Sequence, residues 1–177
     1  MNMNMNIPFV IMSSMIGGKG AFAIKDIKKG EVLCFMNGNE FFVDKIHEKE
    51  INEEENRGDS LQIGDHEYID LDEKYRCINH SCEPNSFLKG KNELIALKNM
   101  EKDEEITYDY SATMFEDKDL IKEKFGEELW IMKCKCGNEN CRNIIGQFYE
   151  LPEELKMKYV DNCWLQDYIL KKYKLKF

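Results

Sequence analysis

The most specific segment of the chain, residues 76–85, reads Arg-Cys-Ile-Asn-His-Ser-Cys-Glu-Pro-Asn. It shows neither the two-residue alternation of a half-buried strand nor the spacing of an amphipathic helix, so we expect a polar, irregular segment. Its side chains are suited to binding. The amide of Asn79 can donate and accept hydrogen bonds, and the thiol of Cys82 can ligate a metal. His80, taken alone, is better explained as a structural histidine.

Short β-prone segments lie on both sides of this stretch, and helical patterns follow later. The β-prone runs are residues 9–12, 21–24, 32–36, 61–63, 67–70, 93–97 and 105–110. Asn37-Gly38 is expected to be a turn, and the charged segment 43–58 a short helix or a loop. Residues 115–130 and 152–174 have helical spacing, and Pro152 suits a first helical turn. This order of elements predicts a β-rich α+β domain.

Three of the seven cysteines lie close together: Cys134, Cys136 and Cys141 form a C-x-C-x4-C arrangement. Thiolates at this spacing can converge on one tetrahedral zinc ion, and Gly137 eases the tight turn between them. A closed structural site needs a fourth ligand. Cys82 is the best candidate, because it lies in the polar segment described above. Spacing alone leaves other candidates open, namely Cys34, Cys77, Cys163 and the histidines.

The composition limits the class of protein. Hydrophobic residues make up 42% and charged residues 33% of the 177 residues, which is typical of a globular domain. Seven cysteines are an odd number and too few for a disulfide scaffold, so metal binding in a reducing compartment is favoured. The longest apolar run, residues 7–12, is too short to cross a membrane, and the initial MNMNMN lacks the pattern of a secretory signal. We therefore expect an intracellular protein, cytoplasmic or nuclear, without a membrane partner.

The net charge restricts the possible partners. At −9, it repels the phosphates of nucleic acids and attracts basic proteins. This charge is compatible with a lysine-rich protein partner, and we expect no direct contact with nucleic acid. A small zinc-dependent nucleic-acid binder is a weaker hypothesis for the same reason. The charge also has a simpler explanation, because a charged surface keeps a protein in solution. Nothing in the sequence indicates an oligomeric state.

Four segments together resemble the SET-domain family of protein-lysine methyltransferases, in the order that the family has them. Residues 76–85 resemble its signature R-x-x-N-H-S-C-x-P-N, and residues 103–110 resemble its strand G-E-E-x-T-x-D-Y. These two motifs are highly specific. Residues 14–23 resemble the family's glycine-rich strand and turn, and residues 134–142 its post-SET zinc knuckle. The resemblance covers residues 14–146, and the chain is similar to compact members without a pre-SET region.

The resemblance implies a SET fold: small curved β-sheets with a threaded, knot-like crossing near the two central motifs, a post-SET zinc knuckle and a C-terminal helix. It divides the chain into a SET domain (1–111), a helical segment with the zinc knuckle (112–146) and a helical tail (147–177). Three positions depart from the family pattern. Cys77 stands where an aromatic residue is common, and Asp103 and Asn143 stand where glycine is frequent.

The resemblance also assigns roles to particular residues. Tyr110 is implied as the catalytic tyrosine, and Tyr108 as a wall of the lysine channel, where a tyrosine accompanies mono- or dimethylation in the family. The implied contacts of S-adenosylmethionine are Lys19, Gly20, Arg76, Asn79, His80 and Ile144. The implied ligands of one structural zinc ion are Cys82, Cys134, Cys136 and Cys141. Without the resemblance, both tyrosines would be interpreted as core residues of a strand.

The implied reaction transfers a methyl group from S-adenosylmethionine to the ε-amine of a lysine in a protein or peptide, with S-adenosylhomocysteine as the product. Histone tails are the family's best-known targets. Free lysine has a pKa of about 10.4 and must be neutral to attack, so a narrow apolar channel that disfavours the ammonium form would help. The alternative is a catalytically inactive SET fold that binds basic peptides. The presence of Asn79, His80 and Tyr110 favours the enzyme.

Overall fold

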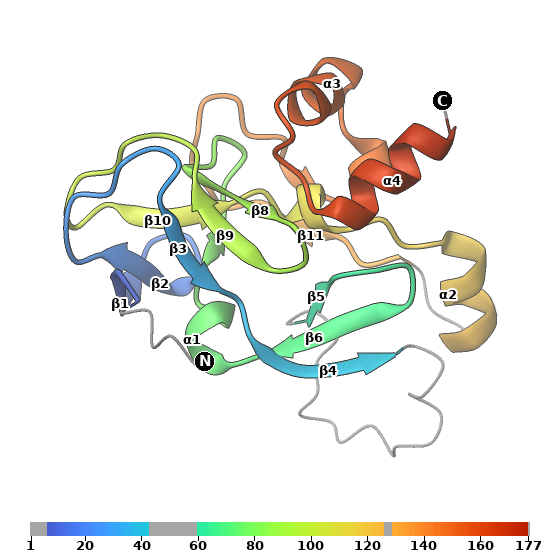
Figure 1. The fold of residues 1–177 in the computed structure, drawn as a ribbon, viewed down its shortest axis with the longest axis horizontal. Helices are drawn as coiled ribbons and strands as arrows, with labels where there is room; N and C mark the ends of the chain where they lie inside the picture. The colour runs from blue at the N-terminus through green and yellow to red at the C-terminus, as the bar shows by residue number, and fades with distance from the viewer. Residues whose placement is uncertain (1–6, 43–59, 126–128, 177) are drawn as a thin grey trace.

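The computed structural model describes residues 7–42, 60–125 and 129–176. Within these ranges the strands form four small sheets, and most of the helical structure follows them in the chain (Figure 1). The predicted β-rich α+β architecture is thus confirmed. The charged segment 43–58 lies outside the described residues. The division of the chain at residues 111 and 146 stays a prediction.

The first sheet brings the two central motifs together. Its order is β1-β2-β10-β7, with bounds β1 Phe9–Ser14, β2 Gly18–Ala23, β10 Glu105–Tyr108 and β7 Asn79–His80. β10 runs antiparallel to β2 but parallel to β7, with Thr107 opposite Asn79 and Tyr108 opposite His80. The expected threaded crossing near these motifs stays a prediction.

Two three-stranded sheets complete the β-rich part. One has the order β3-β9-β8, with bounds Val32–Phe35, Glu93–Ala96 and Ser86–Lys89. The other has the order β4-β6-β5, with bounds Gly38–Phe42, Glu67–Leu71 and Ser60–Gln62. The expected turn at Asn37-Gly38 is wrong, because Gly38 already belongs to β4 and pairs with Leu71. A Cβ atom on Gly38 would collide with the carbonyl oxygen of Asp70, so glycine permits this close pairing.

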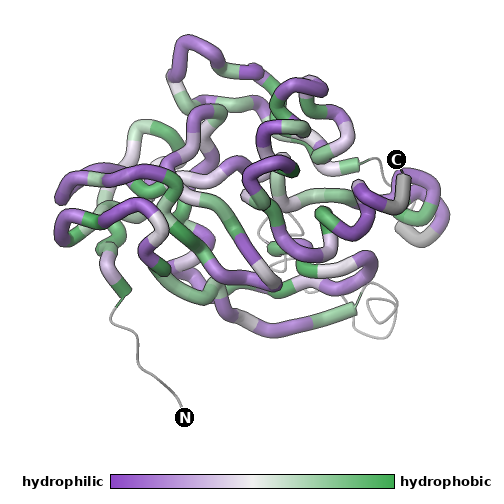
Figure 2. Tube along the Cα trace, turned by 45° about the horizontal axis from the view of Figure 1, so that its top comes forward, coloured by the Kyte–Doolittle hydropathy of each residue, from purple (hydrophilic) through white to green (hydrophobic). Residues whose placement is uncertain are grey.

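The main core lies between these sheets. It includes side chains from all three, among them Leu33, Ile69, Leu94 and Ile106, each no more than 1% exposed. Burying an aliphatic side chain of this size contributes about 1.5–3 kcal/mol, so this cluster dominates the stability of the β-rich part. Figure 2 shows hydrophilic residues along most of the outer loops and hydrophobic residues along the inner segments.

The C-terminal third contributes a second core. The elements of this third are η3 Tyr110–Thr113, α2 Lys118–Phe125, β11 Met132–Lys133, β12 Ile144–Ile145, η4 Phe148–Glu150, α3 Glu153–Asp161 and α4 Asp167–Lys176. One further short helix, α1 Glu73–Arg76, lies earlier in the chain and precedes β7. Phe115, Phe148, Leu165 and Ile169 are buried together there.

The single helix expected over residues 152–174 is wrong, because the tail forms two helices, α3 and α4 (Figure 1). The first ends at Asp161, and Cys163 then adopts a left-handed backbone with φ +54° that no helix continues through. Pro152 is the N-cap of α3 and not a residue of its first turn. No helix within the described ranges has the length and apolar character needed to span a membrane.

The tail docks on the segment that follows β10. The Tyr159 hydroxyl donates to Oδ2 of Asp109 at 2.8 Å, and the Tyr168 hydroxyl donates to the carbonyl oxygen of Thr113 at 2.8 Å. Nζ of Lys172 donates to the Phe115 carbonyl oxygen at 2.9 Å. These bonds hold residues 109–115 between the first sheet and the tail.

Candidate active site

A cavity of about 420 Å³ collects residues from both central motifs. Five of the residues predicted for the site line it: Arg76, Asn79, His80, Tyr108 and Tyr110. The volume lies within the range of about 300–1,000 Å³ that small-molecule sites occupy. The structure therefore places these five predicted side chains in the wall of one cavity.

Tyr110 is held at several points in the cavity wall. Its hydroxyl donates to the carbonyl oxygen of Ile78 at 2.8 Å, and its backbone N–H donates to Nδ1 of His80 at 3.1 Å. Its ring lies 4.8 Å from that of Tyr108, centroid to centroid. Burial raises the pKa of Tyr108 well above its usual value, so this phenol stays neutral. The cavity thus has two adjacent phenol rings, those of Tyr108 and Tyr110.

His80 joins Tyr110 to the cysteine cluster. Burial lowers the pKa of His80 to about 4, against the raising effect of Asp109, so the imidazole is neutral at pH 7. Because Nδ1 accepts from the Tyr110 N–H, the proton is on Nε2, which lies 3.3 Å from Sγ of Cys82. The side chain of His80 thus links the backbone of Tyr110 to Cys82.

Asn79 anchors the glycine-rich turn. Its Nδ2 donates to the carbonyl oxygen of Lys19 and to Oε1 of Glu105, both at 2.7 Å. A Cβ atom on Gly17 would collide with Oδ1 of Asn79, so this glycine allows the turn to approach the cavity. Gly17 lines the cavity, whereas Lys19 and Gly20, the two residues of this turn that were predicted, do not.

Arg76 lines the cavity from α1. Its Nη2 donates to Oδ1 of Asp70 at 2.7 Å, and its Nε donates to the carbonyl oxygen of Leu71. Ile144 is 49% exposed on β12 and is absent from the cavity lining, while its neighbour Ile145 is present. The contacts of all six predicted residues with a cofactor stay predictions, although Arg76, Asn79 and His80 line the cavity and Lys19, Gly20 and Ile144 do not.

Sequence reasoning missed part of the cavity wall. Tyr68 and Glu116 line it, and they are joined by a hydrogen bond of 2.9 Å from the Tyr68 hydroxyl to Oε1 of Glu116. Trp130 lines it as well. The alternation of residues 67–70 could have indicated which side chain of β6 faces inward, but no sequence signal singled out Glu116.

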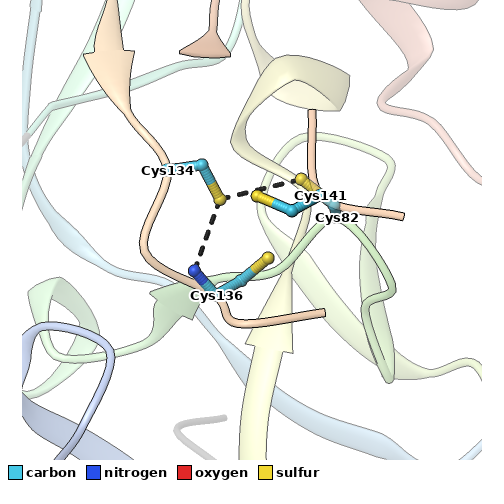
Figure 3. A group of neighbouring side chains, drawn as sticks. All are labelled: Cys82, Cys134, Cys136 and Cys141. Carbon is cyan, nitrogen blue, oxygen red and sulfur yellow. Dashed lines mark hydrogen bonds between the residues drawn. The ribbon is translucent and has the colours of Figure 1, made fainter. Parts of the chain in front are cut away.

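Four cysteines form a group of the size that zinc requires. The sulfur atoms of Cys82, Cys134, Cys136 and Cys141 lie within 4.8 Å of one another (Figure 3). The Cys82 and Cys134 sulfur atoms are 3.7 Å apart, and a tetrahedron with Zn–S bonds of about 2.3 Å has edges of about 3.8 Å. The four thiols thus fit a structural zinc ion in their donor chemistry and their spacing. Such a site is closed and has no position for a substrate.

Other proteins are similar in sequence to much of this chain. Residues 18–111 match the SET domain family. The chain is 30% identical over 148 residues to the histone-lysine N-methyltransferase trithorax of Drosophila virilis, covering 76% of the chain and 4% of that protein. It is 31% identical over 141 residues to the human histone-lysine N-methyltransferase 2D, covering 73% of the chain and 2% of that protein. The chain therefore corresponds to a small part of these relatives.

Solved structures share the fold. Arabidopsis thaliana SUVH6, in complex with S-adenosylmethionine, has a TM-score of 0.60 at 20% identity over 80% of this chain and 33% of that one. KRYPTONITE, in complex with mCHG DNA and S-adenosylhomocysteine, has a TM-score of 0.57 at 24% identity over 80% and 29%. The architecture of four small sheets is thus that of a SET fold. Because the family match covers more than half of the residues, the chain belongs to the SET-domain family.

Proposed function

We propose that the chain is a protein-lysine methyltransferase that uses S-adenosylmethionine. The observation that carries the proposal is the shared cavity: Asn79 and His80 of one motif lie in its wall with Tyr108 and Tyr110 of the other. A two-substrate reaction needs its donor and acceptor groups side by side. The parallel pairing of β7 with β10 places Tyr108 opposite His80, and Tyr110 follows two residues later in η3.

The donor would supply an electrophilic methyl group on a sulfonium ion. The lysine nitrogen attacks in line, the N–C bond forms as the C–S bond breaks, and the amine proton leaves to solvent. Tyr110 would sit beside the transferring carbon. Because its hydroxyl proton is directed to the carbonyl of Ile78, its oxygen is oriented to accept weak hydrogen bonds from the methyl group and the amine. Positioning, and not proton abstraction, is therefore the role of this phenol.

Tyr108 would form the channel wall for the target lysine. It is 7% exposed and neutral, so it excludes water and offers an aromatic face to a methylated cation. A tyrosine leaves less room beside the amine than a phenylalanine does. We therefore propose mono- or dimethylation as the usual product.

The cysteine cluster would hold one structural zinc ion with Cys82, Cys134, Cys136 and Cys141. It would fasten the knuckle to the loop that follows His80, and thus shape the donor side of the cavity. The substrate would be a lysine-containing protein inside the cell, with basic histone tails as the first candidates, because the chain has a net charge of −9. Direct binding of nucleic acid is not part of the proposal.

Incubation with labelled S-adenosylmethionine and purified histones or a cell lysate tests the proposal. We expect label on lysine, mapped by mass spectrometry, and loss of most of it in Tyr110→Phe. The thermal midpoint of the variant and its affinity for S-adenosylhomocysteine show whether the fold and the donor site survive. A catalytically inactive binding module would retain basic peptides but transfer no methyl group, and that outcome would contradict the proposal.

A further inference from the structure

Glu116 places a carboxylate in the wall of the cavity. It is 8% exposed, and it is the only aspartate or glutamate among the described residues that line the cavity. A carboxylate in such a position is costly to desolvate unless polar groups stabilise it. Its surroundings therefore decide whether it is available to a ligand in a fixed orientation.

Hydrogen bonds orient this carboxylate from two sides. Oε1 accepts from the Tyr68 hydroxyl at 2.9 Å, and Oε2 accepts from Nε2 of Gln147 at 3.3 Å. Gln147, which is fully buried, also accepts from the backbone N–H of Glu116 at 2.9 Å. The neighbouring backbone N–H of Phe115 donates to the side chain of Gln62 at 2.8 Å. The protein thus holds the carboxylate in place before any ligand binds.

The charges of the cavity wall are segregated by element. The cationic lining residues Arg76, Lys133 and Lys135 belong to α1 and to the segment that begins at β11. Glu116 instead bonds to Tyr68 of β6 and to Gln147. Asn79 bonds to the glycine-rich turn, on the side assigned to the methyl donor. A fixed carboxylate beside aromatic side chains suits an organic ammonium group.

We propose that Glu116 binds the cationic ε-amine of the target lysine when the substrate enters, with Tyr68 as its positioning residue. The inference rests on the proposed function and names the form of the substrate that the cavity captures. A nearby carboxylate favours the ammonium form, whereas attack requires the neutral amine. Glu116 therefore acts in substrate capture and in the choice of lysine over neutral side chains, and it is not the group that promotes methyl transfer.

Paired peptides separate this role from a purely structural one. Histone-tail peptides with a single lysine are compared with the same peptides carrying norleucine, which has nearly the same length and no charge. Binding is measured by fluorescence anisotropy with S-adenosylhomocysteine present. We expect the native protein to prefer lysine by about tenfold or more, as a hydrogen bond to a charged group implies. Glu116→Gln should lower the preference below about threefold.

Two further variants keep the test decisive. Tyr68→Phe retains the charge of Glu116 but loses one of the hydrogen bonds that orient it. It should therefore reduce the preference for the lysine peptide by a smaller factor than Glu116→Gln does. If Glu116→Gln does not fold, Tyr68→Phe takes its place as the test. Glu40→Gln removes an exposed carboxylate that pairs with Lys91 outside the cavity, and it should leave the preference unchanged. In steady-state assays Glu116→Gln should raise KM for the peptide more than it lowers kcat, with the affinity for S-adenosylhomocysteine unchanged.

The outcomes distinguish this inference from the proposed function. An unchanged preference for lysine in both Glu116→Gln and Tyr68→Phe, or equal weakening of the lysine and norleucine peptides, overturns the role of Glu116. Absence of methyl transfer by the native protein counts against the proposed function instead. Methyl transfer with an unaltered preference counts against this inference alone.

Discussion

Nη2 of Arg142 donates a hydrogen bond to Oδ1 of Asp109 over 2.6 Å in the interior of the protein. Arg142 directly follows Cys141 of the cysteine cluster, and Asp109 directly precedes Tyr110. A single ion pair thus joins the zinc knuckle to the end of β10. The carboxylate of Asp109 also accepts a hydrogen bond from the backbone N–H of Ser111 at 3.0 Å. Through this bond Asp109 caps the start of η3. The position of Tyr110 therefore depends on contacts that lie far apart in the sequence.

Arg142→Met should destabilise the fold by about 3–5 kcal/mol, because removing one partner leaves the carboxylate of Asp109 buried without its counter-charge. Unfolding in urea measures the loss. Lys91→Met is the control: its pair with Glu40 is exposed, so its contribution should stay below about 1 kcal/mol. An equal loss in the free energy of unfolding for the two substitutions would show that the buried pair stabilises the fold no more than the exposed one does.

Cys136→Ser should abolish stoichiometric zinc binding. The native chain is expected to hold one zinc ion per molecule, measured by plasma mass spectrometry after dialysis, because four thiolates converge within 4.8 Å. The variant should also lose affinity for S-adenosylhomocysteine as the knuckle loosens. Cys163→Ser, which removes an exposed thiol outside the cluster, should retain both properties. Full zinc content in Cys136→Ser would contradict the four-cysteine site.

Tyr108→Phe should shift the product toward higher methylation states. Removing the hydroxyl enlarges the space beside the amine and costs little stability, since the ring remains buried with Tyr110. Mass spectrometry of a modified peptide over time would show di- and trimethyllysine accumulating where the native protein stops earlier. An unchanged product distribution would mean that Tyr108 lies away from the transferring nitrogen.

Cys34 should resist alkylation in the native protein. Burial raises the pKa of its thiol to about 12, so at pH 8 roughly one molecule in ten thousand carries the reactive thiolate. Treatment with N-ethylmaleimide followed by peptide mapping should label the exposed Cys163 first and leave Cys34 unmodified. After unfolding in urea, both should react. Labelling of Cys34 at the rate of Cys163 in the folded protein would contradict its burial.

The sequence predicted the site best where local motifs carry it. Asn79, His80, Tyr108 and Tyr110 lie in two short, specific segments, and one pairing of β7 with β10 brings them together. Cys82 was chosen from several candidates because its segment is polar, and its sulfur atom does lie with those of the knuckle. Local chemistry of this kind is visible in a sequence because each motif keeps its residues within a few positions.

Two departures from the family pattern acquire a physical reason. Asp103 and Asn143 stand where glycine is frequent, and both adopt a left-handed backbone, with φ +68° and φ +65°. Aspartate and asparagine enter this region more readily than most other residues do. The conformation that glycine would supply is therefore retained without glycine.

Features that depend on tertiary docking could not be read from the sequence. The helical spacing of residues 152–174 continues through the break near Cys163, since periodicity does not report where a tail turns back on the domain. Glu116 has the residue type of a solvated acidic position in the sequence. It becomes part of the cavity wall only because Gln147 and Tyr68, distant in the chain, bond to it.

The parallel pairing of β7 with β10 also sets an order of assembly during synthesis on the ribosome. The strand that carries His80 has no neighbour in its sheet until Tyr108 has emerged. Cys134 follows Cys82 by 52 residues, and Tyr159 follows Asp109 by 50 residues. The cavity can therefore be complete only after residues of the C-terminal third, such as Trp130 and Ile145 in its wall, have been synthesised.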